Sequence, residues 1–193
     1  MQDNTQSSLK NKPEWPVRLA LLSEIADLEK LIHLSVNGLQ AATYSDMQRS
    51  GALGSVFGVD SQLIQDGTYF VVERDSMIIG CGGWSRRKKL CGSSHVGAND
   101  GEMIDPLTEP ARIRAFFVHP DWARQGVGTS ILHASEMAAY KAGFTRLELA
   151  ATLAGVPLYQ VHGYTMGEKF SIALANGEQL PVIRMSKEIF PAK

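Results

Sequence analysis

One stretch of the chain, residues 116–129, joins an apolar strand, a polar crossing and a glycine-containing turn that opens a helix. It reads FFVHPDWARQGVGT. The first amides of a helix have no intrahelical acceptor and lie at the positive end of the helix dipole, so a phosphate group placed there gains several hydrogen bonds. Gly126 and Gly128 have no side chain that would hold a phosphate away from this backbone. The residue types and their spacing therefore predict an anion site made of main-chain N–H groups.

Two familiar phosphate-binding turns do not fit this stretch. A nucleotide P-loop has Lys and then Ser or Thr directly after its last Gly, whereas here Gly128 is followed by Thr129, Ser130 and Ile131. A dinucleotide fingerprint needs a third Gly and an acidic residue at the tip of the next strand, in a repeating βαβ pattern. What remains is a diphosphate-binding turn without a metal site, followed by a helix and a strand at 146–150.

With these features the chain resembles the acetyl-CoA-binding core of the GCN5-related N-acetyltransferase (GNAT) family, whose loop follows R/Q-x-x-G-x-G/A. The resemblance covers about Val17 to about Lys187 and is strongest from Ile113 to Tyr164. It implies that coenzyme A is bound by Arg124, Gln125, Gly126, Val127, Gly128 and Thr129. The leading Arg or Gln of the family falls on Ala123 here, a loss that matters little if the phosphate contacts come mainly from the backbone.

A second element also matches, because residues 158–164, LYQVHGY, resemble the family's helix that ends in an aromatic residue and Gly. The resemblance implies that Tyr159 is the general acid that protonates the leaving thiolate. It also places the backbone of Phe117 and Val118 beside the pantetheine arm, near the thioester oxygen. An Asn that is common before the last helix falls on Thr152, which is therefore the expected but weaker contact to the arm.

The resemblance implies direct transfer of an acetyl group from acetyl-CoA to a primary amine of a small molecule or peptide, with no metal. The general base stays open. The family's acid on strand four falls on Arg112, and a water chain or any of Glu73, Glu102, Asp105, Glu109 and His119 could serve instead. Arg112 and Arg114 could recognise a substrate carboxylate, or could pair with Glu148 or a neighbouring strand.

Purely structural interpretations of these residues are also open. Tyr159 could be a packed aromatic residue, and the two glycines could form an ordinary turn from strand to helix. The alternative function is a non-catalytic module that binds or senses acyl-CoA. The departures at Ala123 and Thr152 keep this alternative open.

The composition agrees with a compact intracellular enzyme. The 193 residues are 44% hydrophobic, which suffices for one domain with a real core. A formal net charge of −1 gives no reason to expect nucleic acid, and no apolar run is long enough for a membrane span. Cys81 and Cys91 are interpreted as reduced thiols rather than as a disulfide framework. We therefore expect a cytoplasmic protein.

The pattern along the chain predicts a flexible tail at residues 1–14 and one acetyltransferase domain at residues 15–193. Strands are expected at 16–20, 68–73, 77–84, 112–118 and 146–150, and helices from Ser23, from Ser45, at 61–65, after Gly126 and from Pro157. Gly38 is expected to end the first helix. Residues 86–110 form an insertion between the third and fourth strands, interpreted equally as a surface excursion or a substrate-side lid.

Strand four alternates, which predicts Ile113, Ala115 and Phe117 on one face of the sheet. A closing hairpin is expected to join 170–174 to 182–185 across Asn176 and Gly177, and its exposed edge could pair two subunits as a homodimer. The predicted fold is thus an α/β (α+β) GNAT-like domain. Its sheet is mixed but mostly antiparallel, has six or seven strands flanked by helices, and splays apart at strands four and five.

Overall fold

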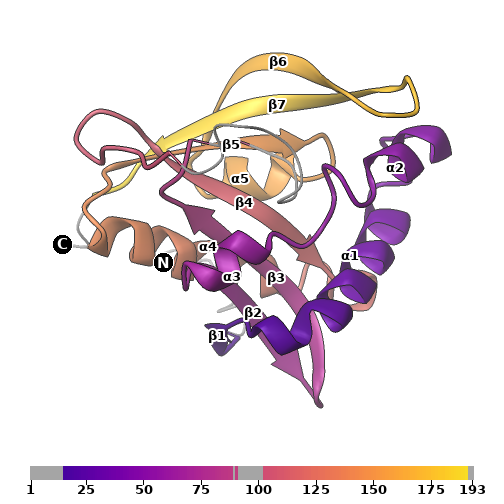
Figure 1. Ribbon diagram of the computed structural model, residues 1–193, viewed down its shortest axis with the longest axis horizontal. Coiled ribbons are helices and arrows are strands. Elements are labelled where there is room, and N and C mark those ends of the chain that lie inside the picture. Colours follow the sequence, from indigo (N-terminus) through magenta and orange to yellow (C-terminus); the bar gives the residue numbers. More distant parts are fainter. Residues whose placement is uncertain (1–14, 89, 91–101, 191–193) are drawn as a thin grey trace, which may run out of the picture.

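The computed structural model describes residues 15–88, 90 and 102–190 (Figure 1). The strands are β1 Val17–Leu19, β2 Tyr69–Arg74, β3 Met77–Ser85, β4 Ala111–Val118, β5 Arg146–Thr152, β6 Thr165–Ala173 and β7 Gln179–Glu188. The α-helices are α1 Ile25–Leu39, α2 Asp46–Ala52, α3 Ser61–Gln65, α4 Val127–Lys141 and α5 Val156–Val161, and two 3₁₀ turns lie at Leu22–Glu24 (η1) and Pro120–Trp122 (η2).

The strands form one mixed sheet in the order β1-β2-β3-β4-β5-β7-β6. Neighbouring strands are antiparallel except for β4 and β5, which are parallel. Helix α4 is the crossover that parallel neighbours require. The predicted fold class, with its sheet of six or seven strands, is therefore confirmed.

Helices cover both faces of this sheet, as the alternating strand residues show. In β2, Tyr69 and Val71 belong to the core cluster that contains α1, α2 and α3, whereas Val72 packs with α4. Successive side chains of a strand point to opposite faces, so α1–α3 lie on one face and α4 on the other. Tyr159 of α5 belongs to a cluster that also holds residues of α4, which places α5 on the α4 face.

A β-bulge in β4 separates this strand from β5. Ala115 and Phe116 lie opposite the single residue Gly82 of β3, and Ala115 has a φ of 55°, a strained value for a residue other than Gly. The buried hydroxyl of Tyr69 donates to the Ala115 carbonyl at 3.0 Å and holds this conformation. Pairing of β4 with β5 is confined to Ala111 and Arg112. Beyond Arg112 the two strands diverge, which confirms the predicted splay.

The bulge also makes the predicted alternation of β4 wrong. Ile113 packs in the cluster of α4, whereas Ala115 and Phe117 pack in the cluster of α1 on the opposite face. The extra residue at the bulge shifts the following side chains by one position. No pattern in the strand sequence marks this shift, because both registers place apolar residues on both faces.

Two glycines set how closely the helices approach the sheet. Gly38 does not end the first helix, which continues to Leu39; instead a Cβ on Gly38 would lie 2.5 Å from the Pro120 ring. A Cβ on Gly80 of β3 would lie 2.4 Å from a methyl group of Val127, the first residue of α4. Both glycines therefore permit close packing around the end of β4 and the start of α4.

The closing hairpin is confirmed and is longer than predicted, since β6 and β7 extend from Thr165 to Glu188 around the turn at Gly177. It forms the yellow arch at the top of Figure 1. Strand β6 is the last strand of the sheet. The homodimer expected at this edge stays a prediction.

The described ends of the predicted insertion pair with each other. The Lys88 amide donates to the Glu102 carbonyl, and the Ile104 amide donates to the Arg86 carbonyl. Ile104 is buried in the cluster of α4. The middle of the insertion, including Cys91, lies outside the described residues.

Cys81 is fully buried, and burial raises the pKa of its thiol to about 12. Of the helices that the structure describes, none has the length and apolar character to cross a membrane.

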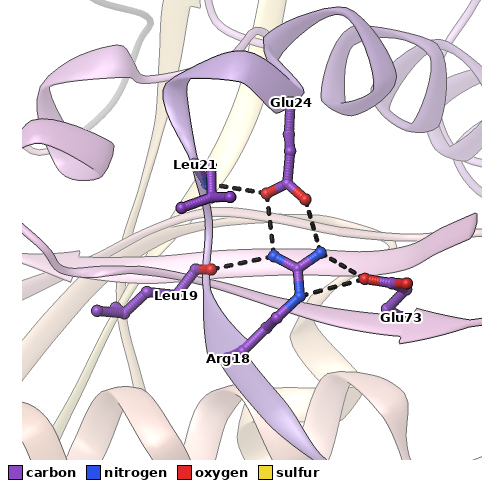
Figure 2. A network of polar contacts seen from close by, with 5 residues as sticks. All are labelled: Arg18, Leu19, Leu21, Glu24 and Glu73. Atoms are coloured by element: carbon purple, nitrogen blue, oxygen red, sulfur yellow. Dashed lines mark hydrogen bonds and ion pairs between the residues drawn. The ribbon is translucent and has the colours of Figure 1, made fainter. Parts of the chain in front are cut away.

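A charged cluster ties the start of α1 to the edge of the sheet (Figure 2). The Arg18 guanidinium of β1 donates to both carboxylate oxygens of Glu24 and to Glu73 of β2, and the Leu21 amide donates to Glu24. The hydrogen bond from Arg18 is the main cause that lowers the pKa of Glu24 below its usual value. A carboxyl group whose pKa is lower in the folded protein than in the unfolded chain stabilises the fold when it is ionised. This contribution is fully present above the pKa of the unfolded chain, about 4.3, and is lost as pH falls through the pKa of the folded protein.

We therefore expect the free energy of unfolding at pH 7 to be larger for the wild-type protein than for Glu24→Gln. This difference should shrink as pH falls below about 4. Urea unfolding at pH 7, 5, 4 and 3 measures it. The matched control is Glu29→Gln, at an exposed position of α1. A difference between wild type and Glu24→Gln that stays constant with pH would contradict the assignment.

Candidate active site

A cavity of about 370 Å³ opens where β4 and β5 diverge. Its walls come from residues 113–118 of β4, from Ala150 and Thr152 of β5, from the start of α4 and from α5. Residues of α1 and of the loop after α2 line it as well. Because α1 and α5 cover opposite faces of the sheet, the cavity passes through the sheet. Its size falls in the range of small-molecule sites.

The predicted glycine turn forms one end of this cavity. Gly126 has a φ of 93°, a value that Gly adopts without strain, and the preceding Arg124 also has a positive φ, 64°. Trp15 donates from its indole to the Gln125 carbonyl at 2.9 Å, and the Gln125 side chain donates to the Asp121 carbonyl at 2.8 Å. These contacts preorganise the turn. The Gln125 side chain therefore supports the loop, whereas Arg124 lines the cavity.

The first amides of α4 are placed as the sequence predicted. The Ser130 amide is the first to find an intrahelical acceptor, at the Gly126 carbonyl, so those of Val127, Gly128 and Thr129 precede the helical hydrogen-bond ladder. Gly128 and Thr129 line the cavity. The Thr129 hydroxyl lies 3.1 Å from Nε2 of His162. The main chain here can bind an anion in the way expected of a helix N-terminus.

Tyr159 lies on the cavity wall formed by α5 and is otherwise buried. Its ring makes edge contacts with Phe116 of the bulge and with Tyr164. Burial raises the pKa of the Tyr159 hydroxyl well above its usual value. The phenol is therefore protonated at neutral pH, which is the state that a general acid requires.

Phe117, Val118 and Thr152 all line the cavity. The Val118 amide donates to the Ser35 hydroxyl of α1 at 3.3 Å, so this amide, which the resemblance expects near the thioester oxygen, has a protein partner in the structure. The Thr152 hydroxyl accepts from the Gly155 amide at 3.2 Å and helps to shape the turn that begins α5.

Both arginines of β4 take structural partners, Arg112 the expected Glu148 and Arg114 a residue at the start of α3 that was not expected. Arg112 pairs with Glu148 of β5, and Arg114 pairs with the buried Asp60 at 2.7 Å. Only Arg114 of the two lines the cavity. Among the described residues that form its walls, no carboxylate or imidazole is found, so Glu73, Glu102, Asp105, Glu109 and His119 lie elsewhere.

Sequence reasoning missed the residues that α1 contributes. Ser35 and Gln40 line the cavity from the α1 face, although both are more than 70 residues away in sequence from the glycine turn. Ser35 is detectable in the helical pattern only as a polar residue on the buried face. Gln40 follows the last residue of α1 and carries no sequence signal for a site.

A model of the acetyltransferase (GNAT) domain matches residues 65–166, from the end of α3 to the start of β6. A search of curated proteins gave no match.

Solved structures with this fold include a GCN5-related N-acetyltransferase from Rhodopseudomonas palustris. It is 19% identical with a TM-score of 0.69, over 92% of this chain and 98% of that one. The PaiA N-acetyltransferase from Thermoplasma acidophilum, in complex with coenzyme A, is 12% identical with a TM-score of 0.61, over 90% and 98%. YncA from Salmonella typhimurium, with acetyl-CoA, is 13% identical with a TM-score of 0.60, over 94% and 97%. At these identities the likeness shows the fold.

Proposed function

This chain belongs to the GNAT acetyltransferase family, and on that premise we propose that it transfers the acetyl group of acetyl-CoA directly to a primary amine of a small molecule or peptide. One observation carries the proposal. A single cavity joins a helix N-terminus that can bind a diphosphate to a buried, protonated tyrosine. The solved complexes of PaiA with coenzyme A and of YncA with acetyl-CoA support the choice of cosubstrate.

The residues fit this cosubstrate. The amides of Val127, Gly128 and Thr129 would hold its diphosphate, with Arg124 adding positive charge at the same end. The exposed edge of β4 beyond Arg112 would accompany the pantetheine arm, since β5 does not pair with β4 there. Gly128 lets α5 pack closely on the start of α4, because a Cβ at this position would lie 3.3 Å from the Leu158 side chain.

The acetyl transfer forms one carbon–nitrogen bond and breaks one carbon–sulfur bond. Acetyl-CoA supplies the acetyl carbon, to which the amine nitrogen bonds while the carbon–sulfur bond breaks. The Tyr159 hydroxyl donates its proton to the departing sulfur, and the nitrogen loses one proton to water. Solvent restores the Tyr159 proton. The products are an N-acetylated amine and coenzyme A with a free thiol.

The test separates catalysis from binding alone. We expect acetyl-CoA to bind the purified protein in calorimetry, and a panel of primary amines to yield equal amounts of free thiol and N-acetylated product by mass spectrometry. A non-catalytic module would bind acetyl-CoA and release no thiol with any amine. Trapping an acetylated protein residue during turnover would instead contradict direct transfer.

A further inference from the structure

A contact between His162 and Thr129 joins the helix that carries Tyr159 to the helix that begins after the glycine turn. Nε2 of His162 lies 3.1 Å from the Thr129 hydroxyl, within hydrogen-bond distance. Thr129 is the third residue of α4, and His162 directly follows α5. Residues of both helices line the cavity. One of the two side chains must donate this hydrogen bond, and the choice decides what Thr129 can offer to a ligand.

Packing between α4 and α5 fixes the position of the His162 ring. Leu158, one helical turn before His162, lies against the start of α4, where a Cβ on Gly128 would be 3.3 Å from the Leu158 side chain. The ring of His162 also makes an edge contact with the ring of His133, with centroids 5.1 Å apart. His133 lies one turn after Thr129 in α4. The imidazole therefore packs on the first two turns of α4.

The Thr129 side chain tilts toward the first amides of α4. The Cα–Cβ bond of every helical residue leans toward the N-terminus of its helix. In α4 this is the end where the amides of Val127, Gly128 and Thr129 precede the helical hydrogen-bond ladder. Thr129 lines the cavity there and is only partly buried. Its hydroxyl can therefore add a side-chain donor to a phosphate that these amides bind.

The threonine hydroxyl has only one proton to donate. If Thr129 donates to Nε2 of His162, this proton is lost to a phosphate, and the hydroxyl oxygen turns a lone pair toward the anion. If His162 carries a proton on Nε2 and donates to the Thr129 oxygen, the hydroxyl proton can point to the phosphate instead. A phosphate at the start of α4 favours the second arrangement, because its negative charge attracts the proton and repels the lone pair.

We infer that His162 is a positioning residue for the cosubstrate: its Nε2–H donates to Thr129, and the Thr129 hydroxyl donates to the diphosphate of coenzyme A. This inference rests on the proposed function and adds to it a side chain that acts on the anion through Thr129. Helix α5 and the residue that follows it then serve both ends of the cosubstrate, the diphosphate through His162 and the departing sulfur through Tyr159.

The two proton arrangements predict different effects of removing the imidazole. With His162 as donor, His162→Leu should weaken coenzyme A binding about tenfold in calorimetry and raise KM for acetyl-CoA by the same factor, with kcat unchanged. His162→Gln carries an amide N–H at nearly the position of Nε2 and should restore affinity to within about threefold of wild type. With Thr129 as donor, His162→Leu would release the hydroxyl and leave affinity unchanged or higher, which would overturn the inference. The matched control is His33→Leu, at an exposed position of α1.

A double-mutant cycle distinguishes this role from a purely structural one. Thr129→Val keeps the shape of the side chain and removes the hydroxyl, so it should also weaken coenzyme A binding about tenfold. In the Thr129→Val background, His162→Leu should cost less than about twofold more, because His162 acts through the hydroxyl that is already gone. Additive losses, about a hundredfold in the double variant, would overturn the inference.

Nitrogen NMR of the wild-type protein identifies the protonated ring atom without any substitution. The imidazole signals of His162, assigned by their absence from His162→Gln, should show a proton on Nε2 in the complex with coenzyme A. A proton on Nδ1 alone, at saturating coenzyme A, would overturn the inference while the proposed function stands. A wild-type protein that binds no coenzyme A would overturn both.

Discussion

Replacing Gly126 by Asp is expected to weaken acetyl-CoA binding on the order of 100-fold, since it places a like charge against the cosubstrate phosphates. Gly126 is the residue before α4, so an Asp side chain there can accept from the same first amides that would hold the diphosphate. The negative charge also lies at the positive end of the helix dipole, where it favours the fold and repels the phosphates. Binding is measured by calorimetry with acetyl-CoA and with coenzyme A.

Gly126→Asn is the matched control for this experiment. Gly126 has a φ of 93°, and Asp and Asn tolerate positive φ better than other non-glycine residues, at a similar backbone cost of roughly 1 kcal/mol. Asn reproduces the size and the backbone effect without the charge, so it should lose much less affinity. Equal affinities of wild type and Gly126→Asp, with both folded by thermal melting, would place the phosphate site away from α4.

Tyr159→Phe should lower kcat about 100-fold and leave coenzyme A affinity unchanged, as expected for the loss of a general acid. The ring packs on Phe116 and Tyr164, and Phe preserves both contacts while it removes only the hydroxyl. The measurement is release of thiol under saturating amine and acetyl-CoA. Tyr140→Phe, at an exposed position of α4, controls for an unspecific effect. If kcat is unchanged in Tyr159→Phe, Tyr159 is not the general acid and serves only in packing.

The raised pKa of Tyr159 gives the same experiment a pH dependence. Burial keeps the phenol protonated above its ordinary value near 10, so wild-type kcat should show no decline from loss of this proton between pH 7 and pH 10. A fall in kcat across that interval that disappears in Tyr159→Phe would contradict the burial of this group.

Local sequence predicted the elements that are proposed to hold the cosubstrate. A glycine turn and the helix that follows it depend on residues that are neighbours in the chain, and the structure places both as expected. Tyr159 was singled out by a family resemblance that seven consecutive residues carry, and its role stays a prediction. The roles proposed for these residues rest on the family resemblance and await the experiments above.

The rest of the cavity could not be predicted, because it depends on contacts between distant residues. The bulge at Ala115 is held by Tyr69, 46 residues earlier, and it decides where β4 leaves β5. Arg114 was an open choice between substrate and structure until Asp60 was found beside it. Nothing in the residues around Gln40 distinguishes its side chain from that of any polar residue after a helix.

The amino-acid sequence by itself determined the glycine turn before α4 and the order of strands and helices along the chain, because backbone conformation and helix termini follow from short-range sterics and hydrogen bonding. Tertiary structure alone decided which side chains meet in the opening between β4 and β5. Burial removes water from a polar group, and whether a protein partner replaces that water depends on chain segments far away. Gln40 and Arg114 show the two outcomes, one left without a partner at Oε1 and the other neutralised by Asp60.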